Sequence, residues 1–275
     1  IVVEAGGIFD WAASNGRPLV WTLSSKPHVV DGTMIVSRYG LDTGMSQTFT
    51  GSGRLDIASF SYCRGQALSV RDGLRLNVGG DFATANTNGE PMCATIALAD
   101  ATLGACADWT YGPSAAATDR ASLGTTSAQR ALVLTGSCTV DTQNPDTGAA
   151  QTIVFADPID GSSGSLEKKG VGRLVLTRDD NDLTGGLTLT AGTVVLGAPN
   201  VGFVAESVTF VGGGLSIPKA ARRAYGNWTT LLKARSVVGE LTCPDGYLEL
   251  RTVRQDDFVE IQGRGTAKGL MYIIR

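Results

Sequence analysis

Residues 166–196 show the clearest alternation of apolar and polar positions in this chain. Three short apolar runs, at residues 174–176, 187–189 and 194–196, are separated by Gly, Asn and Asp at close intervals. Alternation is typical of β-strands, in which successive side chains point to opposite faces, and Gly and Asn supply the positive φ of tight turns. Strands this short cannot bury a core alone, so we expect them to stack as coils of a solenoid.

Further short strands are predicted on both sides of this region. The clearest lie at residues 19–21, 34–36, 55–57, 67–70, 74–78, 95–98, 131–134, 138–140, 152–156, 208–210, 215–217, 247–253 and 258–261. The series of coils is predicted to begin near Leu68 and to become regular from Ala131, although the sequence shows no certain long-range duplication. Residues 107–130 break the pattern with Pro113 and an Ala/Ser-rich run, which predicts a loop excursion from the body.

The spacing of residues 166–196 resembles the autotransporter-associated β-strand repeat, found in passenger regions of bacterial surface and secreted proteins. The positions that carry the resemblance are Leu166, Lys168, Gly170, Gly172, Leu174, Leu176, Asn181, Thr184, Gly185, Gly186, Ala191, Gly192, Thr193 and Leu196. The turn departs from the family pattern, because residues 178–181 read Arg-Asp-Asp-Asn and Leu183 replaces the usual aromatic residue. The match covers about a tenth of the chain.

This resemblance implies a right-handed parallel β-helix on an exported bacterial protein. We therefore predict an all-β fold in which residues 1–236 form the β-helix, with about a dozen coils of roughly 20–25 residues. Residues 237–275 are predicted to form terminal coils or a β cap, because an uncovered end exposes strand edges that promote aggregation. The chain begins with Ile1 rather than Met, as expected of a processed chain or a fragment; the resemblance places a leader upstream and a membrane barrel downstream.

Composition and charge exclude several classes of protein. The 275 residues include 36 glycines, and 18% are charged. This composition is too apolar for a disordered chain, and Gly is too frequent for a helical protein. The net charge of −3 predicts no general attraction to nucleic acid. No apolar run approaches the roughly 20 residues of a membrane helix.

Residues 218–236 contain the basic cluster of the chain. Its members are Lys219, Arg222, Arg223, Lys233 and Arg235, with Tyr225 and Trp228 close by. Cations beside stacking aromatic residues also occur in nucleic-acid grooves. Because the run is short and the chain is acidic, we interpret the cluster as a solvated turn and strand.

Five cysteines, Cys63, Cys93, Cys106, Cys138 and Cys243, show no Cys-x-x-Cys spacing, so the sequence does not support a zinc or redox motif. Cys93 and Cys106 are the nearest candidates for a disulfide in an oxidising compartment. Buried, unpaired cysteines acting as small apolar residues are the alternative. The odd count leaves at least one thiol free or paired between chains.

No constellation of residues predicts catalysis, cofactor binding or metal binding. The lone histidine, His28, lies in a predicted early loop, and we interpret it as structural. Asp179, Asp180 and Asp182 lack the Gly and distal Glu of a calcium loop, so a solvated turn is favoured over weak calcium binding. Asp157 and Asp160 could serve a glycosidase only at a defined carboxylate separation, which the sequence does not reveal.

We therefore expect a structural or adhesive β-solenoid, extracellular or at the bacterial cell surface, without enzymatic activity. Its expected partners are further copies of itself, in fibres or oligomers, and a host or surface glycan receptor. A carbohydrate-active β-helix enzyme, a polysaccharide lyase or hydrolase, is the main alternative, since the same fold hosts both classes. A third hypothesis is a ligand-binding module within a larger passenger protein.

Overall fold

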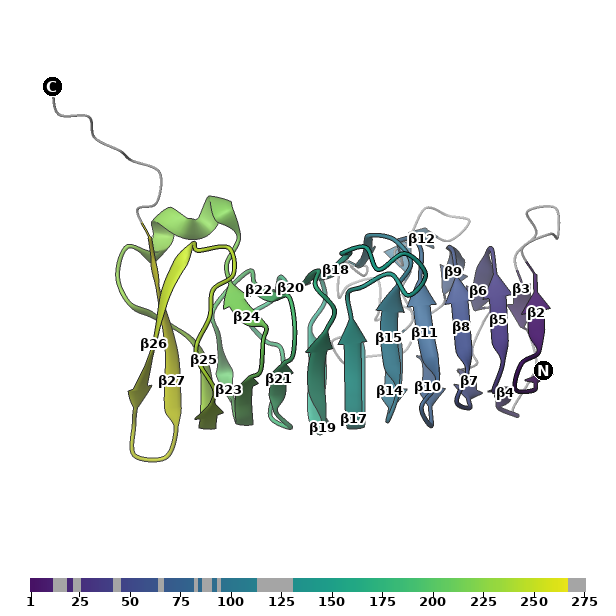
Figure 1. Cartoon of the computed structure of the whole chain (residues 1–275), viewed down its shortest axis with the longest axis horizontal. Coiled ribbons are helices and arrows are strands. Elements are labelled where there is room, and N and C mark those ends of the chain that lie inside the picture. The colour runs from purple at the N-terminus through teal and green to yellow at the C-terminus, as the bar shows by residue number, and fades with distance from the viewer. Residues whose placement is uncertain are drawn as a thin grey trace, which may run out of the picture.

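The computed structural model describes residues 1–11, 19–21, 26–41, 46–63, 67–81, 84–85, 91–92, 95–112 and 131–266. Short strands stack side by side along the long axis of the molecule, from the N-terminus at one end to β26 and β27 at the other (Figure 1). Nearly all neighbouring strands run parallel, and each coil contributes strands to up to three faces. The predicted all-β, parallel β-helix fold is confirmed.

The first face is built from the strands that open each coil. They are β1 (Val2–Val3), β4 (His28–Val30), β7 (Gln47–Thr50), β10 (Ala67–Arg71), β14 (Thr95–Ala99) and the first halves of β17 (Leu132–Asp141) and β19 (Ile159–Lys169).

The second face follows after a tight corner. It consists of β2 (Ile8–Asp10), β5 (Thr33–Val36), β8 (Arg54–Ile57), β11 (Arg75–Val78), β15 (Thr102–Ala105), the second halves of β17 and β19, β21 (Leu187–Leu189), β23 (Asn200–Phe210) and β25 (Thr229–Val238). These are ten stacked strands within the described residues, somewhat fewer coils than the predicted dozen.

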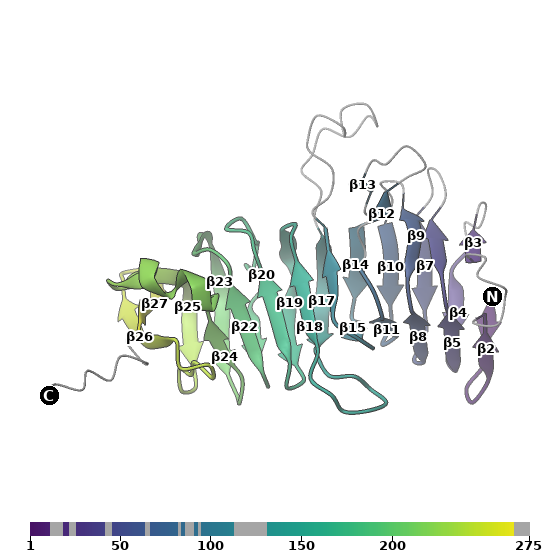
Figure 2. The same cartoon turned by 90° about the horizontal axis from the view of Figure 1, so that it is seen from above.

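The third face is made of two shorter sheets and a small hairpin. The sheets contain β3 (Leu19–Trp21), β6 (Tyr39–Leu41) and β9 (Phe60–Cys63), and β16 (Trp109–Tyr111), β18 (Thr152–Phe155), β20 (Arg173–Leu176), β22 (Thr193–Leu196) and β24 (Gly214–Ser216). Figure 2 shows the second of these sheets along the stack. The hairpin pairs β12 (Thr84–Ala85) with β13 (Pro91–Met92).

The register shows that the solenoid repeats every 20 or 21 residues where nothing is inserted. Met34, Leu55 and Leu76 are register partners at a spacing of 21 residues, and Leu166, Leu187 and Val208 repeat this spacing. The regular coils therefore begin with the first strands and not near Leu68, as the sequence had suggested. Inserted residues lengthen the coils between β11 and β17 and conceal the period there.

The interior is filled by columns of inward-facing aliphatic side chains. Met34, Leu55, Leu76 and Leu103 are fully buried on successive strands, and the residues that alternate with Met34 on β5 and with Leu55 on β8 are only partly buried. Burial of one such side chain contributes roughly 1.5–3 kcal/mol. Because each column continues through the neighbouring coils, the core is shared along the whole stack.

The predicted C-terminal β cap is present. After β25 the pairing changes from parallel to antiparallel: β27 (Val259–Gly265) pairs with β25, and β26 (Leu248–Arg254) pairs with β27. The 3-10 helix η1 (Lys219–Tyr225) precedes β25 and lies beside the cap (Figure 1). Leu248 and Ile261 of the hairpin are buried and close the core at this end.

The predicted excursion at residues 107–130 is wrong in its first part. Trp109 and Tyr111 belong to β16, and both side chains are buried against Phe155 of the next coil. The chain therefore stays in the body of the solenoid as far as Gly112. Residues 113–130 lie outside the described part of the chain.

Candidate functional site

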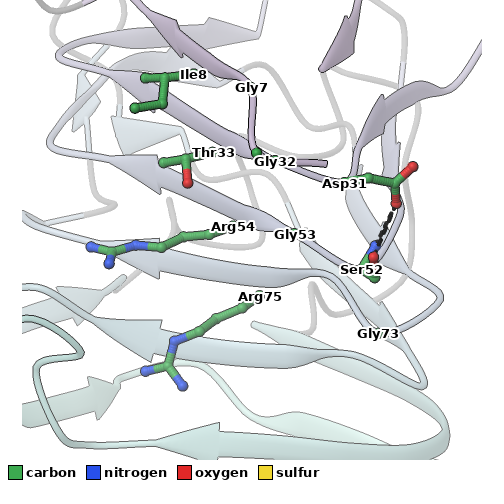
Figure 3. Close-up of a pocket in the computed structure, with 11 residues that line it drawn as sticks. Gly7, Ile8, Asp31, Gly32, Thr33, Ser52, Gly53, Arg54, Gly73 and Arg75 are labelled. Atoms are coloured by element: carbon green, nitrogen blue, oxygen red, sulfur yellow. Dashed lines mark hydrogen bonds between the residues drawn. The ribbon is translucent and has the colours of Figure 1, made fainter. Parts of the chain in front are cut away.

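A groove of about 550 Å³ lies along the corner between the first and second faces, near the N-terminal end (Figure 3). Successive coils bring the same turn to this corner, so the groove runs across four coils. Its lining is Gly6, Gly7, Ile8, Asp31, Gly32, Thr33, Ser52, Gly53, Arg54, Gly73 and Arg75. Because the glycines have no side chains, backbone atoms and short polar groups form the floor of the groove and face solvent.

One wall of the groove is a column of outward-facing side chains in register. Ile8, Thr33, Arg54 and Arg75 are consecutive partners on β2, β5, β8 and β11 (Figure 3). On the opposite side, the carboxylate of Asp31 accepts hydrogen bonds from the backbone N–H and hydroxyl of Ser52, at 2.9 and 3.2 Å.

The two arginines are held in place by a polar network on the second face. Nε of Arg54 donates to Asp56 at 2.8 Å, and Nε of Arg75 donates to the side-chain oxygen of Asn77 at 2.7 Å. The amide nitrogen of Asn77 in turn donates to Asp56 at 2.7 Å. Each guanidinium is therefore fixed by a residue two positions along its own strand.

A loop from a later coil completes this network. Residues 142–151, called the strap here, extend from β17 towards the N-terminal strands (Figure 2). Both oxygens of Asp146 accept bonds from the two terminal nitrogens of Arg54, each at 2.6 Å. Asp141, at the end of β17, forms an ion pair with Arg75 at 2.8 Å.

These contacts set the electrostatics of the groove. The carboxylates of Asp146 and Asp56 raise the pKa of Arg54, and Arg54 lowers the pKa of Asp146 through the same bonds. Both guanidinium charges are thus balanced by carboxylates. The groove offers fixed donors and acceptors without a net cation, which suits recognition of hydroxyl-rich ligands better than binding of anions.

Asp146→Asn is expected to loosen the strap without unfolding the solenoid. The substitution removes the charge of a paired but solvent-exposed group, and such pairs add little to global stability. We expect amide hydrogen exchange in residues 144–149 to become about fivefold faster, while the midpoint of unfolding stays unchanged. The same loosening is expected in the wild type as pH falls below about 4, because protonation of Asp146 removes a bond present at higher pH. Unchanged exchange in the strap would contradict its dependence on Arg54.

His28 is an interior residue and not part of an early loop. It lies in β4, is 1% exposed, and packs on Phe49 with ring centroids 4.9 Å apart. Its Nε2 lies 3.3 Å from the side-chain oxygen of Gln47, and burial lowers the pKa of His28. The surroundings agree with the structural role predicted for it.

Three of the acidic residues considered for catalysis or calcium binding, Asp160, Asp180 and Asp182, form local contacts within their own turns. Asp160 and Asp182 come into register as bridge partners on adjacent coils, but each carboxylate accepts hydrogen bonds from the residue two positions ahead, Ser162 or Thr184. Asp180 forms an ion pair with Arg178 at 3.1 Å.

The remaining candidates, Asp157 and Asp179, lie in the bends that follow β18 and β20. Within the described residues, no group of three or more His, Cys, Asp or Glu side chains is arranged to hold a metal ion. The buried Asn181 shapes the turn, as predicted: its side chain accepts a hydrogen bond from the N–H of Ile159 and donates one to the carbonyl of Arg178.

The basic cluster divides between two elements. Lys219, Arg222 and Arg223 belong to η1, where a turn was predicted, whereas Lys233 and Arg235 lie in β25. The Arg235 guanidinium pairs with Glu206 at 3.3 Å. Tyr225 is buried.

Three of the cysteines carry free thiols in the structure. Cys138 is buried, as the apolar alternative predicted, and Cys106 and Cys243 are partly exposed. Burial raises the pKa of the Cys106 and Cys138 thiols, which makes them poor nucleophiles. Cys63 lies in β9, and Cys93 lies outside the described residues. Because Cys106 carries a free thiol, the suggested disulfide between Cys93 and Cys106 is not formed in the structure.

The residues of the polar network were not predicted from the sequence. Arg54 and Arg75 are spaced by 21 residues after Ser-Gly and Asp-Gly-Leu turns, a signal that would have revealed both the coil and the column. Asp141 of β17 and Asp146 of the strap give no such signal, because their partners lie 66 and 92 positions away.

We compared the chain with models of protein families, with curated proteins and with solved structures, and none of the three comparisons gives a match. Among the described helices, none is long and apolar enough to cross a membrane.

Proposed function

We propose that this chain is a structural and adhesive β-solenoid, secreted by a bacterium or exposed on its surface. The observation that carries the proposal is the unbroken series of parallel strand pairs from β2 to β25. The resemblance of residues 166–196 to the autotransporter-associated repeat supports export and surface display.

The mechanism of such a scaffold is mechanical. Each coil forms hydrogen bonds with the coil before it and the coil after it, so opening one coil disrupts two ladders and the columns of buried side chains. The outer faces are then free to carry contacts. The polar groove and the strap are surfaces of this kind, held rigid by the stack beneath them.

The cap restricts how copies can assemble. The outermost strand, β26, exposes Glu249, Arg251 and Arg254 along its length, and charged edge strands resist pairing with another sheet. Self-association is therefore expected through the N-terminal end or through the faces, and not by stacking on the cap.

Electron microscopy combined with a cleavage assay tests the proposed function. We expect single rods or laterally associated fibres, a protease-resistant fragment containing residues 131–266, and no release of reducing ends from a panel of polysaccharides. Polysaccharide cleavage by strictly monomeric particles would overturn the proposal in favour of a carbohydrate-active enzyme. Rapid proteolysis throughout residues 131–266 would contradict a rigid scaffold.

A further inference from the structure

The outer face of the cap sheet carries one continuous polar network across three strands. Arg251 of β26 donates through Nε and Nη2 to the side-chain oxygen of Gln262 in β27, at 3.0 and 2.7 Å. The nitrogen of Gln262 donates to Glu260 at 2.7 Å, and Thr230 of β25 donates to the same carboxylate at 3.0 Å. These bonds place the four side chains on one face.

Aromatic rings anchor the cations of this face. The guanidinium carbons of Arg251 and Arg264 lie 4.2 and 4.9 Å from the ring centre of Trp228, and Nζ of Lys233 lies 5.3 Å from that of Phe258. A guanidinium stacked on a ring keeps its edge N–H groups directed outward in a fixed plane. The cap therefore presents cations that are already oriented for a ligand.

The charge of Arg251 is not balanced in the way the charges of Arg54 and Arg75 are. Arg264 pairs with Glu249, whereas Arg251 is exposed and, within the described residues, bonds only to a neutral amide oxygen and stacks on a neutral ring. Its two terminal nitrogens keep N–H groups that a carboxylate can bind.

Positively and negatively charged residues are unevenly distributed along the chain. Residues 1–218 contain 13 Lys and Arg against 20 Asp and Glu, whereas residues 219–275 contain ten against six. The excess in residues 219–275 comes from η1 and from residues 267–275, because residues 229–265, which contain β25, β26 and β27, hold five Lys and Arg against six Asp and Glu. On the outer face itself, Lys233, Arg251 and Arg264 lie beside Glu249 and Glu260. The acidic body repels a polyanion, whereas these five side chains of the outer face include one more cation than carboxylates, so a polyanion is expected to bind at this face and not on the body.

We propose that the outer face of the cap, formed by β25, β26 and β27, binds an acidic polysaccharide whose sugars bear carboxylates. This inference rests on the proposed adhesive function and names its ligand class and its surface. Arg251 would bind a sugar carboxylate in bidentate fashion, with Lys233 and Arg264 adding positive charge. Gln262, Glu249 and Glu260 would bind the hydroxyl groups between carboxylates.

Two other polyanions fit this face less well. Nucleic acid is bound in such sites by stacking bases on aromatic rings, but the Trp228 ring already contacts two guanidinium groups. Its dense phosphates would also face Glu249 and Glu260. An anionic membrane would require exposed apolar side chains for insertion, and the network side chains of this face are polar.

Binding to polygalacturonate, with its methyl ester as the matched neutral polymer, tests the proposal by titration calorimetry on the full chain. We expect the wild type to bind the acid form at least tenfold more tightly than the ester. Arg251→Gln is expected to weaken binding about five- to tenfold. Arg251→Lys, which keeps the charge but loses the planar fork, is expected to show a loss of similar size.

Arg178→Gln is the control, because it removes the same charge from an exposed site on the body and should leave binding unchanged. The proposal fails if the methyl ester binds equally well, if Arg178→Gln weakens binding as much as Arg251→Gln, or if Arg251→Lys binds like the wild type. Equal or tighter binding of polyglutamate, single-stranded DNA or phosphatidylserine vesicles would also overturn it. Such a failure concerns the cap alone, whereas failure of the scaffold function would appear in the microscopy and cleavage assays.

Discussion

Replacing Gly53 with alanine is expected to lower the free energy of unfolding by about 3 kcal/mol or more. Gly53 lies at the corner between the first and second faces, directly beneath Gly32 of the previous coil. A Cβ at this position would overlap the carbonyl oxygen of Gly32 and lie 2.7 Å from that of Val30. Both obstacles are backbone atoms that also hold the ladder: the N–H of Gly53 donates to Val30 at 2.9 Å.

Relief of this overlap requires two coils to separate, because no flexible side chain can move instead. A loss of about 3 kcal/mol corresponds to a fall of roughly 6–12 °C in the melting temperature of a domain this large. Thermal unfolding followed by circular dichroism measures the change. The substitution should also widen the groove floor at Gly32.

Gly202→Ala is the matched control for Gly53→Ala. Gly202 also lies in the stack, in β23, but a Cβ there meets no atom within 4 Å. We expect its unfolding free energy to change by less than about 0.5 kcal/mol. Equal effects of the two substitutions would show that the coils do not approach as closely at the Gly53 corner as the structure indicates.

The stability that Lys168 confers is expected to increase with pH between about 8 and 10.5. Lys168 is fully buried, and its ammonium donates to the carbonyl oxygens of Lys169, Gly170 and Ala191 at 2.8–3.0 Å. Burial lowers the pKa of Lys168 to about 8, because the three carbonyl groups replace only part of the lost hydration.

The sign of this pH dependence follows from how tightly the folded and the unfolded chain bind the Lys168 proton. Between pH 8 and the unfolded pKa of about 10.4, the unfolded chain holds the Lys168 proton more tightly than the folded chain. Raising the pH therefore favours the folded chain, by about 1.4 kcal/mol per pH unit and on the order of 3 kcal/mol across the window. Below pH 8 both states are protonated and the contribution is constant.

Denaturant titrations of the wild type and of Lys168→Met at pH 7, 8.5 and 10 isolate this effect. The difference in unfolding free energy between the two proteins should shift in favour of the wild type as the pH rises. Lys169→Met removes the same charge from a side chain that is 48% exposed, and should keep the wild-type pH dependence. A difference between wild type and Lys168→Met that is constant from pH 7 to 10 would contradict the lowered pKa.

The alternation of apolar and polar residues was sufficient to predict most strands, whereas the parallel β-helix was predicted from the resemblance of residues 166–196 to a known repeat. In residues 166–196, the apolar runs became β20, β21 and β22; burial alternates along β20 and β21, whereas all four residues of β22 are buried. The prediction succeeded because a period of two is a local property of a strand, and because Gly and Asn mark corners wherever the chain must turn sharply.

The start of the regular coils was predicted incorrectly, for a physical reason. Coils between β11 and β17 contain insertions of unequal length, and a loop can lengthen at small cost while the strands keep their register. The spacing of strands along the sequence therefore varies even though their spacing in space does not. The pairing of Met34 with Leu55 and of Leu55 with Leu76 shows that the first coils belong to the same series.

The sequence by itself determined that this protein is built of short strands that stack around an aliphatic core, because alternation and turn residues are local to each strand and corner. Their parallel arrangement was implied by the resemblance of residues 166–196, and the C-terminal cap by the need to cover the last strand edge. Only the tertiary structure decided which charges meet. The strap brings Asp146 to Arg54 across 92 positions, and the cap hairpin brings Arg251 and Arg264 onto Trp228. Such contacts depend on the number of coils between two residues and on the direction in which a loop folds back, and neither quantity is encoded in the local pattern.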